Sequence, residues 1–272
     1  MKPRVLGAEA ARGLVHAIAR QRGAAIDGEF VPADAVADAY LAGAERDVLI
    51  LPHSAACRLT AQGRVALDFC TDLGARGAPA TVYTVALAKE NVGEAAREFA
   101  LRLTAPDTAG ERASAGFAGA RIRRATGADS AQARDLVFGV LAEYGLAPEP
   151  TGIDADLLDL DAGFLQDGGL FDVAIDPDGR VAACCGMKIL GGGRVELRKM
   201  YVRRGARGAG LGQRLLDRAL AWARARGHPR VDLETASVLK EAIALYRKAG
   251  FVQRPGKPDT CRCDQAFMLE LG

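Results

Sequence analysis

The chain has 272 residues, of which 49% are hydrophobic and 26% charged, values typical of a globular protein with a buried core. Lys and Arg total 36 against 34 for Asp and Glu, and the net charge of +2 argues against a general nucleic-acid or membrane-surface binder. No apolar run reaches the ~18 residues that cross a membrane. The length predicts two domains, because domains commonly have about 100–200 residues.

The N-terminus and the cysteines bear on the compartment and on metal binding. Residues 1–9 lack the apolar run of a secretory signal peptide, which predicts a cytoplasmic protein. The six cysteines form no Cys-x-x-Cys pair and the chain has only three His residues, so we expect no metal site. Cys184 and Cys185 stand together in an apolar stretch, where reduced thiols fill space.

Strands and helices alternate in the first part of the chain. Three apolar runs predict strands, at 4–6, 47–52 and 81–87. Three segments have the apolar spacing of helices, at 10–20, 34–42 and 92–103. The second and third apolar runs are continuous, as in buried parallel strands. This alternation predicts an α/β layer with a mostly parallel sheet.

Several segments of this part resemble the type 2 periplasmic binding proteins, especially the molybdate-binding kind. In chain order they are 47–52 (Asp-Val-Leu-Ile-Leu-Pro), 59–65 (Leu-Thr-Ala-Gln-Gly-Arg-Val), 94–99 (Glu-Ala-Ala-Arg-Glu-Phe), Pro106 and 115–117 (Ala-Gly-Phe). Those proteins clamp a ligand between two lobes, and here only residues 74–80 stand in place of the second lobe. The family's Ser or Thr near the first strand is replaced by Ala8-Glu9-Ala10.

A ligand cleft needs two walls, and a carboxylate at its mouth repels an oxyanion. We therefore expect residues 1–118 to form a single-lobe, non-catalytic domain that packs, forms a homodimer or senses an effector. The segment 109–120, rich in Ala, Gly and Ser, places the domain boundary near residue 118.

Residues 119–272 have a different order of elements. The turn Asp176-Pro177-Asp178-Gly179 joins two of the expected strands. Strands are predicted at 121–126, 171–175, 181–190, 195–202, 231–235 and 261–271. Helices are predicted after Asp129, from Leu211 to about residue 223, and at 238–249.

A strand, a Gly-rich turn and a helix between residues 195 and 219 have the composition of an anion site. Gly208, Gly210 and Gly212 lack the Cβ atoms that would keep a phosphate from the unpaired N–H groups where the helix begins. Positive charge is added by Arg203, Arg204 and Arg207. The spacing differs from a Walker loop and from a dinucleotide-binding Gly-x-Gly-x-x-Gly. The alternative is a turn that only caps the helix.

The order Arg207-Gly208-Ala209-Gly210-Leu211-Gly212, after Glu-Leu-Arg-Lys-Met-Tyr-Val, resembles the acyl-CoA-binding core of the GNAT superfamily of N-acetyltransferases. Leu-Tyr-Arg-Lys-Ala-Gly-Phe at 245–251 resembles the last motif of that superfamily, and the likeness covers about residues 120–271. It implies a mixed, mainly antiparallel sheet flanked by helices, acetyl-CoA as co-substrate, no metal and a small-molecule amine as acceptor. The implied cofactor-binding residues are Met200, Tyr201, Val202, Arg207, Gly208, Ala209, Gly210, Leu211 and Gly212.

The same resemblance implies a bulge in the central strand near Met200, where a backbone N–H would meet the oxyanion. Many GNAT enzymes have Asn seven residues before Tyr246. Leu239 stands there in this chain, so that cofactor contact is missing.

Acetyl transfer to an amine needs a base, because an amine of pKa near 10 is about 99.9% protonated at pH 7. The resemblance implies Glu196 as that base; alternatively, Glu196 pairs with Arg198 or Lys199 across the sheet. Glu234 on the neighbouring strand is the second candidate base, or a contact for the substrate's ammonium group. Tyr246 is implied as the acid for the departing thiolate; alternatively, it is a core aromatic with its hydroxyl at the rim.

Together these patterns predict an α/β protein in which a GNAT N-acetyltransferase domain follows a single-lobe α/β domain. We expect the acceptor to be a small amine or amino acid, with no nucleic-acid or membrane partner. Two alternatives stay open: a regulatory protein whose GNAT part senses acetyl-CoA, and an effector-binding protein that acts through its N-terminal domain. The sensor alternative gains if Glu196 and Tyr246 are both buried and paired away from the thioester.

Overall fold

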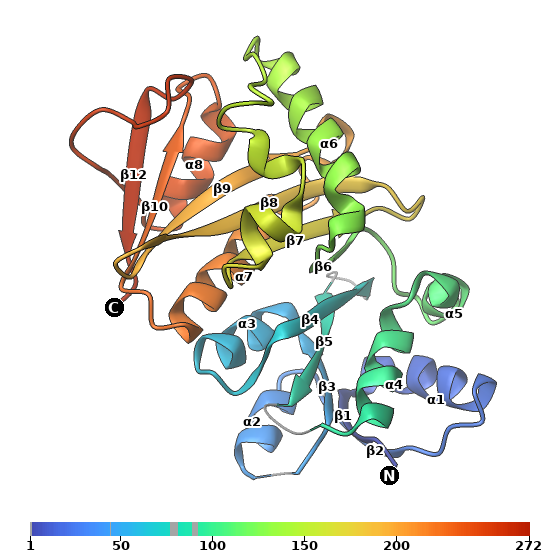
Figure 1. Cartoon of the computed structure of the whole chain (residues 1–272). Coiled ribbons are helices and arrows are strands. Elements are labelled where there is room, and N and C mark those ends of the chain that lie inside the picture. The colour runs from blue at the N-terminus through green and yellow to red at the C-terminus, as the bar shows by residue number, and fades with distance from the viewer. Residues whose placement is uncertain (1, 44, 77–80, 89–91) are drawn as a thin grey trace. The chain divides into compact units, whose positions relative to one another are not determined.

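The computed structural model describes residues 2–43, 45–76, 81–88 and 92–272, which form two compact units (Figure 1). The first unit comprises Met1–Arg123 with the short turn Asp176–Gly179, and the second comprises Arg124–Ile175 and Arg180–Gly272. Each unit has its own sheet and its own helices, which confirms the α/β class. No helix in the described ranges has both the length and the apolar content needed to span a bilayer.

A five-stranded sheet in the order β2-β1-β3-β5-β4 forms the centre of the first unit. Its strands are β1 (Arg4–Ala8), β2 (Asp27–Val31), β3 (Val48–Pro52), β4 (Val65–Arg76) and β5 (Thr81–Ala88). β1 pairs in parallel with β2 and β3, whereas β5 pairs antiparallel with β3 and β4.

The prediction of a parallel strand at 81–87 is therefore wrong in its direction. The long strand β4, which we did not predict, ends only four residues before β5 begins. So short a connection joins antiparallel strands, because parallel neighbours need a crossover of a dozen or more residues. Residues 77–80, part of the segment 74–80 that we expected in place of a second lobe, lie outside the described residues.

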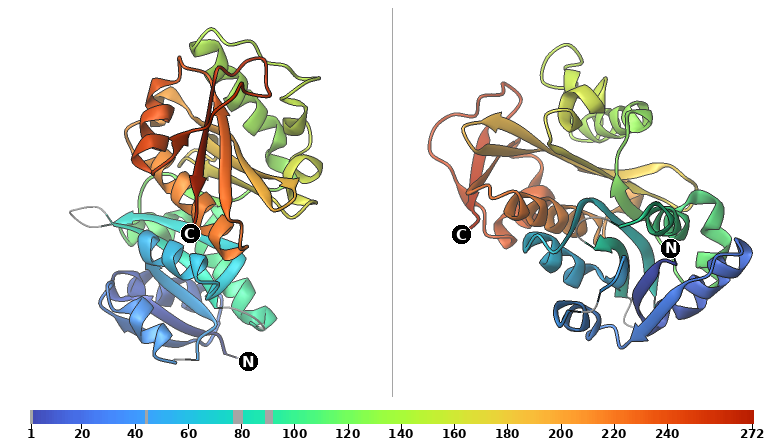
Figure 2. Two further views of the ribbon diagram at one scale, coloured as in Figure 1. Left: turned by 90° about the vertical axis from the view of Figure 1, so that its left-hand side faces the viewer. Right: turned by 60° about the horizontal axis from the view of Figure 1, so that its bottom comes forward.

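Helices cover both faces of this sheet, with α2 and α3 together on one face and α1 and α4 on the other (Figure 2). The helices of this unit are α1 (Arg12–Gln21), α2 (Val36–Leu41), α3 (His53–Ala61), α4 (Glu94–Thr104) and α5 (Ala109–Ser114). Those at 10–20, 34–42 and 92–103 are confirmed. The core includes the fully buried residues Val5, Leu6, Leu49 and Ile50, as the apolar runs of β1 and β3 require.

A seven-stranded sheet in the order β11-β12-β10-β9-β8-β7-β6 belongs to the second unit, apart from Arg121–Arg123 of its edge strand β6, which are counted with the first. Its strands are β6 (Arg121–Arg124), β7 (Leu170–Ile175), β8 (Val181–Gly191), β9 (Arg194–Val202), β10 (Arg230–Thr235), β11 (Val252–Gln253) and β12 (Gln265–Glu270). β9 and β10 are parallel, while the β7–β8, β8–β9, β10–β12 and β11–β12 pairs are antiparallel. The predicted mixed, mainly antiparallel sheet is confirmed.

Three α-helices flank this sheet: α6 (Ser130–Glu143), α7 (Leu211–Ala225) and α8 (Lys240–Lys248). Helix α6 packs on one face of β8 and β9, and α7 packs on the other (Figure 1). Since neighbouring residues of a strand point to opposite faces, Cys184 and Cys185 of β8 are buried on different sides of the sheet. The apolar stripe of α7 is buried as its spacing predicts, with Leu215 and Trp222 at most 2% exposed.

Candidate functional site

The two central strands of the second unit separate along their length. β9 and β10 pair for only three residues, from Val195 opposite Val231 to Leu197 opposite Leu233. On the other side of β9 the register with β8 shifts, so that Lys199 and Met200 lie opposite Cys185 alone. Two residues against one define a β-bulge, which bends a strand and turns it away from its neighbour. The bulge predicted near Met200 is confirmed.

Lys199 holds this bulge in place. Its φ of +52° is the only positive φ among non-glycine residues in the described chain, a conformation that costs about 1–3 kcal/mol. The buried ammonium group donates to the carbonyl of Ile153 and to Asp154, both at 2.6 Å, and lies 3.2 Å from Asp156. Burial alone would raise the pKa of Asp154, but hydrogen bonds from Arg262, a backbone N–H and Lys199 hold that pKa well below its usual range.

A groove of about 440 Å³ opens beside the bulge. Its walls come from β9, α6, α7 and α8 and from the Gly-rich turn. Eight of the nine predicted cofactor-binding residues line it, namely Met200, Tyr201, Val202, Arg207, Gly208, Gly210, Leu211 and Gly212. Ala209 is not among the lining residues. The strand, the turn and the helix therefore meet at one groove.

The turn leaves the beginning of α7 open. Gly210 is the N-cap, with a φ of +73° and no side-chain capping bond, and Gly208 has a φ of +82°. A Cβ atom at either glycine would meet no atom within 4 Å, so both positions face open space. The first N–H groups of a helix have no partner within the helix, and the helix dipole is positive there. This end of α7 has room and donors for an anion.

Gly212 and Arg207 have additional structural roles. A Cβ at Gly212 would lie 3.3 Å from Leu245 and 3.7 Å from Met200, so its small size lets α7 approach α8 and β9. Arg207 donates to the carbonyl of Val202 at 3.0 Å and pairs with Glu143 at 2.7 Å. Glu143 therefore offsets the charge of Arg207 at this end of the groove.

The groove has further lining residues that we did not predict. The hydroxyl of Tyr144, just after α6, donates to Glu241 of α8 at 3.2 Å, and burial raises the pKa of this tyrosine. Gln213 and Lys248 also line the groove. Lys248 lies inside the motif 245–251 and Gln213 in the first turn of α7, so the motif positions could have indicated both.

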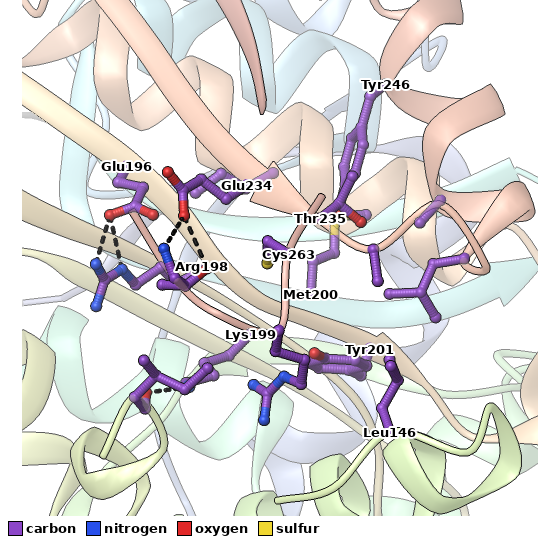
Figure 3. A pocket seen from close by; sticks show the side chains of 17 residues that line it. Leu146, Glu196, Arg198, Lys199, Met200, Tyr201, Glu234, Thr235, Tyr246 and Cys263 are labelled. Atoms are coloured by element: carbon purple, nitrogen blue, oxygen red, sulfur yellow. Dashed lines mark hydrogen bonds and ion pairs between the residues drawn. The ribbon is translucent and has the colours of Figure 1, made fainter. Parts of the chain in front are cut away.

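A smaller cavity of about 80 Å³, which shares Met200 and Tyr201 with the groove, is lined by Glu196, Glu234 and Tyr246 (Figure 3). Glu196 is 7% exposed and accepts from Nε and Nη2 of Arg198, both at 2.7 Å. Burial raises the pKa of Glu196, and the charge of Arg198 opposes that rise. Glu196 thus lines the cavity while paired along its own strand with Arg198, rather than across the sheet.

Glu234 is fully engaged by a loop. It accepts from the backbone N–H of Asp259 at 2.6 Å and from the backbone N–H and hydroxyl of Thr260 at 3.0 and 2.8 Å. Arg254 donates at 3.3 Å. These four donors reach both oxygens of Glu234 and hold its carboxylate against the loop, whereas the hydrogen bond that Glu196 accepts comes from its own strand, from Arg198.

Replacing Glu234 with Ala is expected to destabilise the second unit by roughly 1–3 kcal/mol, because the donors of Asp259 and Thr260 lose their acceptor. At roughly 2–4 °C per kcal/mol for a protein of this size, the melting temperature should fall by a few degrees in a thermal unfolding experiment. Glu270→Ala, at an exposed position on β12, is the control. Equal melting temperatures for the two variants would contradict this role of Glu234.

Tyr246 lies on α8 with 5% of its surface exposed. Burial raises the pKa of its hydroxyl, which therefore stays protonated at neutral pH. Within the described part of the chain this hydroxyl has no hydrogen-bond partner, although Tyr246 lines the cavity. The cavity is also lined by Arg198, Lys199, Thr235, Thr260, Arg262 and Cys263, none of which we predicted as site residues. No group of three or more potential metal ligands occurs among the described residues.

Comparisons with known proteins place this unit in a family. The model of the acetyltransferase (GNAT) family matches residues 139–251. The chain is 37% identical over 135 residues to the uncharacterized N-acetyltransferase YjgM of Escherichia coli (strain K12), a match that covers 48% of this chain and 80% of that protein. It is 43% identical over 77 residues to the IAA acetyltransferase of Azospirillum brasilense, covering 28% and 50% of the two chains.

Two solved structures share the fold. An acetyltransferase of the GNAT family from Staphylococcus aureus Mu50 aligns with a TM-score of 0.52 and 20% identity, covering 56% of this chain and 98% of the other. An acetyltransferase from Streptococcus agalactiae 2603 aligns with a TM-score of 0.52 and 20% identity, covering 57% and 100%.

Proposed function

Because the chain belongs to the GNAT family of acetyltransferases, we propose that it transfers the acetyl group of acetyl-CoA to the amine of a small molecule or amino acid. The observation that carries this proposal is the groove between the bulged strand β9 and the open start of α7. A groove that ends on unpaired helix N–H groups suits a long ligand with a diphosphate. Coenzyme A has this form.

The groove residues fit such a ligand. We assign the diphosphate to the turn of Gly208 and Gly210, where Cβ atoms are absent and the space is open. The pantetheine arm would lie along Met200 to Val202, where β9 no longer pairs with β10. The thioester supplies the acetyl group, and a backbone N–H near Met200 is our candidate donor to its carbonyl oxygen.

Glu196 is the base in this proposal. Its carboxylate lines the cavity beside the bulge and has a raised pKa from burial, which makes it a stronger proton acceptor than an exposed glutamate. Arg198 opposes this rise of the pKa and fixes the position of the carboxylate through two contacts at 2.7 Å. The acceptor's ammonium group loses its proton to Glu196, directly or through water.

Tyr246 is the proposed donor to the departing sulfur. Replacing it with Phe is expected to lower kcat by about 10–100-fold with little change in acetyl-CoA affinity, since only one hydroxyl near the sulfur is lost. Steady-state kinetics and calorimetry measure the two effects separately. Phe251, which packs against the ring of Tyr246 at 5.8 Å between centroids, gives the control Phe251→Leu. A Tyr246→Phe enzyme of normal kcat would make Tyr246 a core aromatic only.

A CoA-release assay across a panel of amines and amino acids tests the proposed activity. Release of CoA with at least one acceptor, dependent on that acceptor, supports the proposal. Tight binding of acetyl-CoA in calorimetry without release across the panel would favour the alternative of an acetyl-CoA sensor. That alternative draws support from the burial of Tyr246 and from the pairing of Glu196 with Arg198.

For the N-terminal part, residues 1–118, we propose a non-catalytic module that packs, dimerises or senses an effector. The resemblance to one lobe of the type 2 periplasmic binding proteins supports this assignment. Calorimetry of the full chain with acetyl-CoA and with molybdate separates the candidates. Binding of acetyl-CoA without binding of molybdate counts against a protein that acts through its N-terminal domain.

A further inference from the structure

A cysteine, a histidine and an aspartate lie in series in the first unit. His53 and Cys57 are one turn apart on α3, and the cysteine Sγ lies 3.5 Å from Nε2 of the imidazole. On the other side of the ring, Nδ1 lies 3.6 Å from Oδ1 of Asp72 on β4. Thr84 on β5 donates to the same Oδ1 at 2.9 Å and fixes the carboxylate. Three elements of the sheet layer therefore converge on this thiol.

Exposure to solvent increases from Asp72 through His53 to Cys57. Asp72 is completely buried and His53 is 8% exposed, while Cys57 is partly exposed. The Nδ1 atom of His53 is buried and has no hydrogen-bond partner in the described chain, so the ring's strongest polar neighbours are the thiol and the carboxylate. An imidazole beside a thiol can accept its proton, and a carboxylate behind the ring orients that imidazole.

The Asp72 carboxylate also has neighbours other than His53. Arg121 also attracts Asp72, so His53 shares the carboxylate with a second cation. The backbone N–H of Ile122 donates to the other oxygen, Oδ2, at 3.4 Å. Oδ1 therefore accepts the hydrogen bond from Thr84 and is the carboxylate oxygen that lies 3.6 Å from Nδ1 of His53.

The geometry excludes two other uses of such residues. The group does not qualify as a metal site among the described residues. Cys57 lies in the middle of α3, whose backbone N–H groups at that point are used within the helix. Acyl transfer at Cys57 would lack the neighbouring N–H donors that stabilise an oxyanion. Thiol–disulfide exchange needs none, because the charge passes from one sulfur to another.

We propose that Cys57 is a reactive thiol, activated by His53 and Asp72, that exchanges with small-molecule disulfides. The Cys57 thiolate attacks one sulfur of R–S–S–R, a new S–S bond forms, the old one breaks, and R–S⁻ leaves and takes up a proton. Cys57 is oxidised to a mixed disulfide and half of the small molecule is reduced. The first unit would thus carry a redox-modified site independent of acetyl transfer.

The test uses the full chain and bis(2-hydroxyethyl) disulfide, an uncharged probe, at pH 5.5. Mass spectrometry of peptides gives the rate of mixed-disulfide formation at Cys57 and at Cys261, an exposed thiol that serves as an internal standard. We expect Cys57 to react roughly tenfold faster, because the imidazole of His53 lies 3.5 Å from its sulfur and can take up the proton of the thiol. In His53→Gln this advantage should disappear while the rate at Cys261 stays the same.

Equal rates at Cys57 and Cys261 in the unaltered protein would overturn the proposal without any variant. So would an unchanged rate at Cys57 in His53→Gln. A lowered thermal unfolding transition in His53→Gln reports damage to the fold of the first unit, and in that case the comparison within the unaltered protein decides. Cys57→Ser identifies the labelled peptide.

Discussion

Replacing Gly210 with Glu is expected to abolish measurable binding of acetyl-CoA, with at least a 100-fold rise in Kd. Three effects act together at this position. A side chain fills the open space at the start of α7, its negative charge repels a phosphate, and a φ of +73° strains any residue with a Cβ. Isothermal titration calorimetry with acetyl-CoA and with CoA measures the loss.

A matched control separates binding from backbone strain. Gly193, in the turn between β8 and β9, has a φ of +76° and equally open surroundings, so Gly193→Glu introduces the same strain and charge away from the groove. We expect this variant to bind acetyl-CoA normally. If Gly210→Glu also binds normally, the beginning of α7 is not the diphosphate site, and the proposed function loses its main support.

Replacing Glu196 with Gln is expected to lower kcat by about 10²–10⁴-fold while acetyl-CoA affinity stays the same, because the amine keeps its proton. The amide has the size of the carboxylate and can still accept from Arg198. Steady-state kinetics with the best acceptor from the panel, together with calorimetry, checks both parts. An unaltered kcat would exclude Glu196 as the base.

The pH dependence provides an independent check on the same residue. Burial raises the pKa of Glu196, and a base must be deprotonated, so kcat/KM should fall as the pH drops through this raised pKa. Arg198 lowers that pKa, and Arg198→Gln should therefore move the acidic limb of the profile to higher pH. The Glu196→Gln enzyme should lack the limb altogether. A limb that persists in this variant belongs to another group.

Interactions between residues close together in the chain explain why the sequence predicted α7, its open start and β9 correctly. The apolar spacing from Leu211 to Trp222 specifies α7, and the glycines before it specify an uncapped helix start, because both signals act within a few residues. The same holds for β9, whose residues match the family motif. Eight of the nine predicted cofactor-binding residues accordingly line one groove.

The sequence did not predict contacts between residues that lie far apart along the chain. The Lys199 conformation depends on Asp154 and Ile153, about 45 positions earlier in the chain, and no local pattern joins them. Glu234 was a reasonable candidate base on its strand, but a loop some 25 residues later supplies donors to both of its oxygens. The donors reach Glu234 only because the loop of Asp259 and Thr260 folds back onto the strand that carries it.

The amino-acid sequence by itself determined the α/β class, the family of the second unit and the helix start that faces the groove, since these follow from short-range spacing and a contiguous motif. Only the tertiary structure decided the antiparallel direction of β5, the pairing of Glu196 with Arg198 and the convergence of Cys57, His53 and Asp72. Each of these depends on which segments pack together. That choice is made by the free energy of the whole fold.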